Sequence, residues 1–426
     1  MNILIKNGRV IDPATGVDDK LDILVEGATI KKIAPDIIAE DVRVIDALNK
    51  IVVPGLIDVH VHFRQPGQTH KETIETGSMA AAGGGFTTVI AEPNTDPPID
   101  TAARIRNILK MAKAESVVNF YTKACITVGS KGKRLARIEE LKKAGAIAIS
   151  DDGHPVFGKR LMHNAFKKAC ECKIQVSPHC EESDYYRERL REKKGEGLLS
   201  FSSYNRETSF IKREIELAER VGWSVHISHV SQAESVREIA GAKRRGVRVT
   251  AEAAPHHFTL TQEATANNTK TNAKVNPPLR LQKDIDAIKE GLQDGTIDAI
   301  ATDHAPHAPY EKDVDWNKAP FGIIGLETAL GLVLTKLVQP GILSLSDAIA
   351  KMAINPARIF GLDAGQLKIG KKADITVIDL EKEWTVKEDE FLSRSKNSPF
   401  IGWQLKGKAV LTIVGGKVVM EDGKKI

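Results

Sequence analysis

The stretch LIDVHVHF, residues 56–63, is a short apolar run that ends in two histidines. Isoleucine and valine favour strands, and the Pro-Gly pair at 66–67 breaks regular structure. We therefore predict a buried strand that ends near residue 63. Side chains two positions apart leave the same face of a strand, so His60 and His62 are expected to lie together, roughly 7 Å apart at Cα.

Seven further segments have the composition of strands, and the intervals between them carry apolar residues at helical spacing. Examples of such intervals are TAARIRNILKMAKAE (101–115), QAESVREIAGAKRRG (232–246) and QKDIDAIKEGLQDG (282–295). Eight β-then-α units in succession predict a TIM (β/α)8 barrel, and a doubly wound open sheet is the alternative. The seven segments are FTTVIAEP (from 86), VVNFYTKACITV (from 117), AIAISDDG (from 146), IQVSPHCE (from 174), SVHISHVS (from 224), VRVTAEAAPHHF (from 247) and IDAIATDHAPH (from 297).

Both ends of the chain have a different pattern, in which apolar and polar residues alternate around short turns. ILIKNGRVID (3–12) contains Asn-Gly, and GKAVLTIVGGKVVMEDGKKI (407–426) contains Gly-Gly and Asp-Gly, all of which favour hairpins. We therefore predict one small, β-sandwich-like domain built from residues 1–54 and 365–426. The barrel is expected to occupy residues 55–364 between them.

Composition argues for a soluble protein rather than a nucleic-acid or membrane protein. The net charge of +5 is small for 426 residues and is spread along the chain. The chain contains no apolar run of about 20 residues and opens without a signal segment. Its four cysteines are too few for a disulfide framework. We expect a cytoplasmic protein that acts on a small molecule and binds neither nucleic acid nor membrane.

Histidines gather where a barrel places its active site, at the carboxyl ends of the strands. Nine of the twelve histidines fall at or just past five of the eight predicted strand ends. A lone His-x-His pair in a strand is more often packing than a ligand pair. Here it has partners at four other strand ends, and such a set can hold two divalent ions. The expected ligands are His60, His62, Asp152, His179, His229 and Asp303, with zinc favoured over manganese or cobalt.

Several strings along the chain resemble one known family. In order, they are GLIDVHVHFRQPG, EPNTDPP, SDDG, HISHVS, VNPPLR, ATDHAPH, PFGIIGLET, NPARIFGL and SKNSPF. They look like the amidohydrolase superfamily, and specifically like dihydroorotases of the long, bacterial-type class. The resemblance implies a TIM barrel with a small β-domain. It also implies a zinc-dependent reaction that interconverts N-carbamoyl-L-aspartate and L-dihydroorotate in pyrimidine (UMP) biosynthesis.

The resemblance also implies roles for the metal-binding residues. His60 and His62 would bind the more buried zinc, and His179 and His229 the second. Many relatives bridge the ions with a carbamylated lysine after the fourth strand, where this chain has Asp152 as ligand or bridge. Asp303 would contact metal and act as the catalytic residue that moves the proton.

A second set of residues is implied to bind the substrate. Arg64 suits the carboxylate of dihydroorotate, because a guanidinium forms two charge-assisted hydrogen bonds with a carboxylate. The implied substrate contacts are His62, Arg64, Asn94, Asn276 and His307, together with backbone groups of Phe321 and Gly322.

Two single residues depart from the usual pattern of these relatives, besides the segment SSYNRET (202–208), where they often carry an Arg-Pro pair. Gln65 stands where an acidic residue often precedes Pro-Gly, which affects how Arg64 is oriented. Glu92 stands where an apolar residue usually precedes Pro93, and we interpret it as a change at the surface or at a subunit contact.

Two alternatives to this function remain open. One is another cyclic amidase of the superfamily, such as an allantoinase or a hydantoinase. The other is a non-catalytic subunit that supports aspartate carbamoyltransferase. Association with that enzyme and assembly into a homo-oligomer are further expectations.

Overall fold

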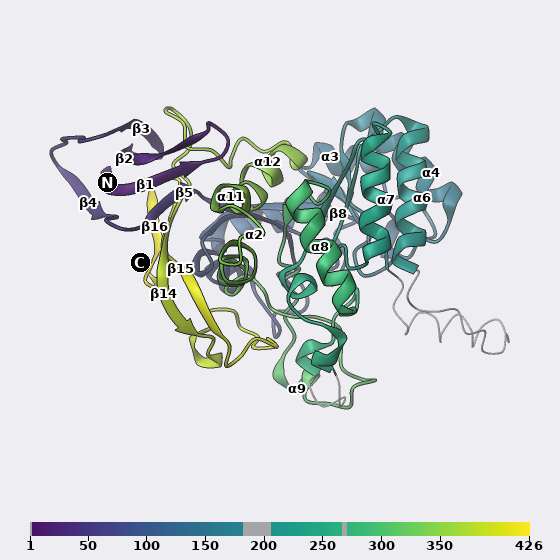
Figure 1. Cartoon of the computed structure of the whole chain (residues 1–426). Helices are drawn as coiled ribbons and strands as arrows, with labels where there is room; N and C mark the ends of the chain where they lie inside the picture. The colour runs from purple at the N-terminus through teal and green to yellow at the C-terminus, as the bar shows by residue number, and fades with distance from the viewer. Residues whose placement is uncertain (1, 182–205, 266–270) are drawn as a thin grey trace.

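The computed structural model of the chain describes residues 2–181, 206–265 and 271–426, and every structural statement below concerns these residues. Two bodies are visible in Figure 1, a barrel ringed by helices and a sheet that contains both chain termini.

The barrel consists of eight parallel strands, each paired with the next one along the chain. The two edge strands then meet, because Val61 and His304 form a parallel bridge and His62 N donates to His304 O at 2.9 Å. The predicted TIM barrel is therefore confirmed and the open sheet excluded. The strands are β6 (Leu56–Val61), β7 (Phe86–Ala91), β8 (Asn119–Ala124), β9 (Ala148–Ile149), β10 (Gln175–Val176), β11 (Val225–Ile227), β12 (Val249–Ala253) and β13 (Ala299–Ile300).

Helices cover the outside of the barrel, and four of them stand side by side in Figure 1 (α4, α6, α7 and α8). The second helix shows why they form: the Thr101 side chain caps its first turn, and Ile105, Ile108 and Ala112 make a buried stripe. The helices are α1 (Ile74–Gly83), α2 (Ala102–Glu115), α3 (Ile138–Lys143), α4 (Lys159–Cys172), α6 (Arg206–Val221), α7 (Ala233–Arg244), α8 (Gln282–Asp294), α9 (Pro309–Lys312), α10 (Ala329–Val333), α11 (Leu345–Met352) and α12 (Ile354–Phe360).

Strands from both ends of the chain form a single nine-stranded sheet. The strand β5 joins its two halves, because it pairs with β1 on one side and with β14 on the other. The small domain built from both termini is therefore confirmed, while its exact boundaries stay predictions. The strands are β1 (Asn2–Asp12), β2 (Val17–Glu26), β3 (Thr29–Ala34), β4 (Val42–Asp46), β5 (Ile51–Pro54), β14 (Ile375–Thr385), β15 (Gln404–Val414), β16 (Lys417–Glu421) and β17 (Lys424–Lys425).

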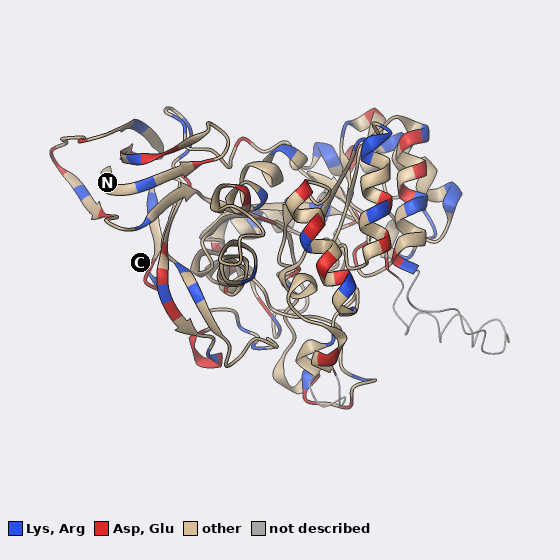
Figure 2. Ribbon diagram, viewed as in Figure 1, with Lys and Arg blue, Asp and Glu red and all other residues tan. Residues whose placement is uncertain are grey.

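Charged residues of both signs are mixed along the outer helices and the terminal sheet (Figure 2). Among the described residues, no helix combines the length and the apolar character that a membrane crossing needs. The four cysteines are free thiols, two of them buried and two half-buried.

The segment between β14 and β15 returns to the barrel and is tied to the loop after β13. Leu392 N and Ser393 N donate to the carboxylate of Glu327 at 2.8 and 3.1 Å. The Asn397 side chain accepts from His307 N at 3.0 Å and donates to Gly322 O at 3.0 Å. Burial raises the pKa of Glu327 to about 7, although the two N–H groups favour its ionised form.

The titration of Glu327 predicts a pH-dependent difference in the free energy of unfolding between the wild type and Glu327→Gln. The carboxyl keeps its proton in the folded protein up to about pH 7, whereas the ordinary pKa of a glutamate is 4.5. Between these values the folded state binds more protons than the unfolded state. The wild type should therefore lose about 1–3 kcal/mol of stability relative to the variant as pH rises through this window. Urea unfolding of both proteins at pH 5 and pH 8 measures this difference, and an equal difference at both pH values would contradict the prediction.

Candidate metal centre and active site

The six residues predicted as metal ligands converge at the carboxyl ends of the barrel strands. His60 lies on β6 and His62 directly after it. The other four residues follow β9, β10, β11 and β13, and all six side chains are buried. Residues 60 and 303 therefore meet because the barrel closes, although 243 positions separate them in sequence.

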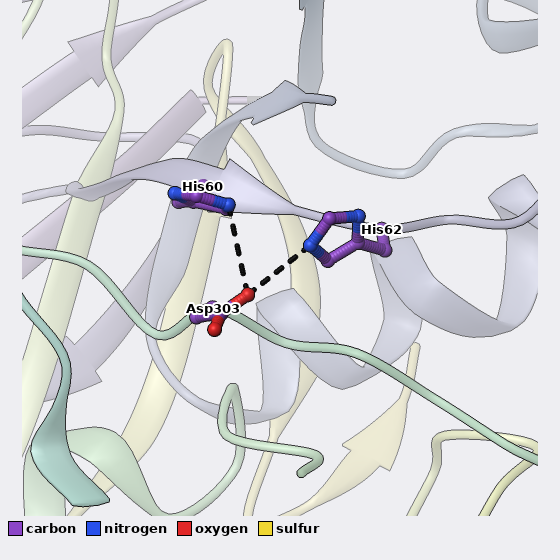
Figure 3. A group of neighbouring side chains, drawn as sticks. All are labelled: His60, His62 and Asp303. Atoms are coloured by element: carbon purple, nitrogen blue, oxygen red, sulfur yellow. Dashed lines mark hydrogen bonds and ion pairs between the residues drawn. The ribbon is translucent and has the colours of Figure 1, made fainter. Parts of the chain in front are cut away.

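A first group consists of His60, His62 and Asp303, whose possible ligand atoms all lie within 4.8 Å of one another. Figure 3 shows both imidazoles directed at the same carboxylate. Asp303 Oδ1 lies 3.1 Å from His62 Nε2 and 3.6 Å from His60 Nε2. Two histidines and one carboxylate at such distances are a donor set that suits zinc.

A second group, His60, Asp152 and His229, meets the same distance criterion. Asp152 Oδ1 lies 3.4 Å from His60 Nε2, 3.5 Å from His229 Nε2 and 3.4 Å from His179 Nδ1. This one oxygen thus faces imidazoles from three strands. His179 Nδ1 also lies 2.9 Å from His229 Nε2, which places the fourth predicted histidine beside this group.

Unpartnered polar atoms at the centre of the two groups fit a bound cation. His60 Nε2 and Asp152 Oδ1 are buried and have no hydrogen-bond partner among the described residues. Such atoms are rare in folded proteins because burial without a partner is costly. Imidazole nitrogens and carboxylate oxygens are also the ligands that divalent transition metals prefer. The residues present therefore fit the metal ions that the sequence predicts.

Glu252 on β12 orients the most buried of these histidines. Its carboxylate accepts from His60 Nδ1 at 2.7 Å and from His226 Nε2 at 2.9 Å. The bond at Nδ1 leaves Nε2 of His60 directed at the two groups, as is common for histidine ligands. His226 lies behind this carboxylate rather than at the centre of the two groups.

The electrostatics of the site keep its acids ionised. Burial opposes ionisation of Asp303, but the imidazoles of His60 and His62 outweigh it and hold its pKa below the ordinary value. Burial opposes ionisation of Glu252 as well, and His60 and His226 hold its pKa well below the usual range. At neutral pH both groups are carboxylates, the form that accepts protons and binds cations.

The backbone is strained at three residues of the site. Arg64, His229 and Asp303 have φ angles of 55°, 34° and 50°, in the left-handed region that non-glycine residues rarely adopt. Strain of this kind persists only where the surroundings enforce it, and it often accompanies function.

A buried guanidinium lies beside the metal-binding residues. Arg64 Nε donates to Pro306 O at 3.1 Å, and its Nη2 lies 3.3 Å from His307 Nε2. Burial lowers the pKa of Arg64 to about 10, and the nearby carboxylates of Asp303 and Asp152 oppose this shift. The side chain is therefore a cation at neutral pH, at the edge of an anionic cluster.

The two asparagines predicted to bind substrate both contact the predicted ligands. Asn94 Oδ1 accepts from His62 Nδ1 at 2.9 Å, and its Nδ2 donates to Asp152 Oδ2 at 3.2 Å. Asn276 Nδ2 donates to His179 Nε2 at 3.0 Å. Both side chains therefore lie where a molecule at the metal centre would contact them.

The loop after β13 brings Phe321 and Gly322 against His307. His307 Nε2 donates to Phe321 O at 2.8 Å, and Gly322 N donates to Lys274 O at 2.9 Å. Gly322 has a φ of 150°, and a Cβ there would lie only 2.5 Å from Ala305 O. Only glycine fits this position. The direct contacts of residues 321 and 322 with substrate stay predictions.

The two departures from the family pattern have different structural outcomes. Gln65 Oε1 accepts from Ile74 N at 2.9 Å, and its Nε2 donates to Glu115 Oε2 at 2.9 Å. It thus joins the start of α1 to the end of α2, while the backbone oxygen of Pro306 accepts from Arg64. Glu92 is buried inside the barrel against Lys123, so our interpretation of it as a surface or subunit-contact change is wrong.

Residues 51–419 match the sequence profile of the Amidohydrolase family. The chain belongs to the amidohydrolase family. It is 50% identical to "Dihydroorotase" of Geobacter sp. (strain M21) over 430 residues, which cover 99% of this chain and 100% of that protein. It is 49% identical to "Dihydroorotase" of Citrifermentans bemidjiense, with 99% and 100% covered. The resemblance found in the sequence is thereby confirmed.

The fold of this amidohydrolase also matches a solved structure. "L-Hydantoinase (Dihydropyrimidinase) from Arthrobacter aurescens" aligns with a TM-score of 0.89 at 29% identity, covering 100% of this chain and 97% of that one. The barrel and the terminal sheet therefore occur together in both proteins.

Sequence reasoning missed three residues that shape the site of this amidohydrolase. Glu252 and Lys123 are charged residues inside otherwise strand-like runs, and that exception was the available signal. Asn397 lies in a motif string, SKNSPF, but nothing in the string shows that it holds the loop of His307.

Proposed function

We propose that this amidohydrolase is a dihydroorotase, which interconverts N-carbamoyl-L-aspartate and L-dihydroorotate in pyrimidine biosynthesis. Relatives about half identical over the whole chain carry that name. The observation that carries the proposal is the buried Arg64 guanidinium beside the His60–His62–Asp303 group. It offers a charged partner for a carboxylate next to the groups that would act on a cyclic amide.

Two zinc ions are proposed as the cofactors of the reaction. His60 and His62 would hold one and His179 and His229 the other, with Asp152 between them and Asp303 as a further ligand. Ions bound there would polarise the ring amide carbonyl and lower the pKa of a water molecule. The unpartnered nitrogen of His60 and oxygen of Asp152 support this assignment.

Asp303 is proposed as the general base and acid. Its carboxylate is ionised and lies within 3.1 Å of His62 Nε2, at the centre of the site. It would accept a proton from the attacking water and deliver it to the leaving ring nitrogen. In the reverse direction it would take the proton from the carbamoyl nitrogen as the ring closes.

Arg64 is proposed to bind the substrate carboxylate, with Asn94, Asn276 and His307 completing the contacts. The asparagines each contact a predicted histidine ligand, so a substrate held by them would lie against the metal centre. His62, Phe321 and Gly322 are proposed as further contacts.

Other parts of the assignment rest on sequence alone. A cytoplasmic location, a homo-oligomeric assembly and association with aspartate carbamoyltransferase stay predictions. Measuring activity with the purified chain alone also tests whether a partner is needed.

A comparison of substrates tests the proposed function. The purified protein is assayed with dihydroorotate, hydantoin and allantoin, before and after metal removal by a chelator. We expect hydrolysis of dihydroorotate, its loss with the metal, and its return on addition of zinc. Turnover of hydantoin or allantoin in preference to dihydroorotate would replace the proposal with the corresponding cyclic amidase. Inactivity on all three would favour the non-catalytic subunit.

Arg64→Met should lower kcat/KM selectively for substrates that bear a carboxylate. Hydrogen bonds to charged groups contribute about 1.5–3 kcal/mol, so kcat/KM for dihydroorotate should fall about 10- to 150-fold. Dihydrouracil has the same ring without the carboxylate and serves as the matched substrate. Equal losses with both substrates would show that Arg64 supports the fold rather than the carboxylate.

Asp303→Asn should abolish most turnover while the protein stays folded. Loss of a general base or acid typically lowers the rate by about 10²- to 10⁴-fold. Metal content of the purified variant, measured by mass spectrometry, separates proton transfer from metal binding. A variant that keeps both its metal and a near-normal kcat would disprove the assigned role.

A further inference from the structure

A buried ion pair lies inside the barrel, directly below the proposed metal centre. It joins Glu92, at the end of β7, to Lys123 on β8, and both side chains are fully inaccessible to solvent. Lys123 Nζ also donates to Ser177 Oγ at 3.1 Å. Taking both charges out of water is unfavourable, and an apolar pair of similar size would avoid that penalty. The pair is thus unexplained by packing alone.

The carboxylate of Glu92 faces the proposed ligand atom of His60. Its Oε1 lies 3.7 Å from His60 Nε2, nearly the distance at which Asp152 and Asp303 face the same nitrogen, 3.4 and 3.6 Å. Glu92 Oε1 contacts Lys123, whereas Glu92 Oε2 has no hydrogen-bond partner among the described residues, and neither has His60 Nε2. One imidazole nitrogen is therefore surrounded by three carboxylates from three different strand ends.

The 3.7 Å between Glu92 Oε1 and His60 Nε2 is a distance found between two ligands of one metal ion, although Glu92 is not a member of either of the two groups described above. Ligands bound at about 2.1 Å to one zinc lie roughly 3 to 4 Å from each other. Glu92 Oε1 meets this condition toward His60 as well as Asp303 does. The ammonium of Lys123 lies on the same oxygen, so it restrains the carboxylate and offsets the extra negative charge.

We propose that Glu92 is a further ligand of the metal ion bound at His60 and that Lys123 positions its carboxylate. The inference rests on the proposed metal centre and adds to it a residue that the six predicted ligands do not include. The competing explanation is a buried ion pair that only fills the barrel interior.

Glu92→Gln tests the proposal by metal binding rather than by activity. The matched control is Glu214→Gln, which changes another buried glutamate that contacts an arginine, on helix α6. Each protein is stripped of metal, and zinc affinity is measured by competition with a coloured chelator. Glu92→Gln should lower the affinity for one of the two zinc ions by at least about tenfold, because loss of a group that only supports a ligand already has an effect of this size. Glu214→Gln should leave the affinity for both zinc ions unchanged.

Cobalt gives a second readout, because its visible absorption reports coordination geometry. The cobalt-loaded Glu92→Gln protein should differ in spectrum from the wild type and from the control. An unchanged zinc affinity together with an unchanged cobalt spectrum would overturn the proposal. If the wild type itself binds no metal, the proposed metal centre fails instead, so the two failures are distinguishable.

Two variants at Lys123 test whether a loss of zinc binding results from misfolding and whether the ion pair has only a structural role. Lys123→Met leaves Glu92 without its cation, so the metal-free protein should be destabilised and zinc should raise its Tm more than it raises that of the wild type. The double variant Glu92→Met/Lys123→Met removes both charges and should fold, yet bind one zinc more weakly. A double variant with wild-type zinc affinity would show that the pair only packs, which would also overturn the proposal.

Discussion

The closing contact of the barrel is the constraint on which the rest of the structure depends. His62 N donates to His304 O, and Val61 bridges to His304, so the first strand lies beside the last. This contact brings His60 and His62 against Asp303. The same closure places Arg64 beside Pro306 and His307. The predicted metal ligands and the buried Arg64 guanidinium are thus neighbours because one backbone pairing joins the two ends of the barrel.

The second determinant of the site is how charge is balanced among buried side chains. Asp152, Glu252 and Asp303 all lie around His60, and each is buried. Polar atoms at the centre, His60 Nε2 and Asp152 Oδ1, have no hydrogen-bond partner among the described residues. Lys123 supplies a positive charge from below. Such an arrangement is unfavourable for an empty protein interior and favourable for one that binds cations.

The terminal sheet and the segment beyond β14 contribute to the site indirectly. Ser393 and Asn397 belong to the C-terminal part of the chain, yet they contact the loops after β6 and β13. Asn397 holds Ala305 and Gly322 by their carbonyl oxygens. The loop that bears His307 is therefore positioned by residues 90 positions away. This dependence gives the small domain a part in the geometry of the site.

Much of this architecture followed from local pattern, because strand composition, helical spacing and turn chemistry are properties of neighbouring residues. The eight strands, the three helical intervals and the placement of histidines at strand ends were all readable in this way. The burial of Glu92 was not predicted, because it does not follow from a local pattern. Its burial depends on Lys123, which lies on another strand and looks like an ordinary charged residue in sequence. The sequence by itself determined the barrel and the kinds of ligand that it carries. Only the tertiary structure decided which charges face one another, since burial and pairing arise from contacts between strands that local pattern does not encode.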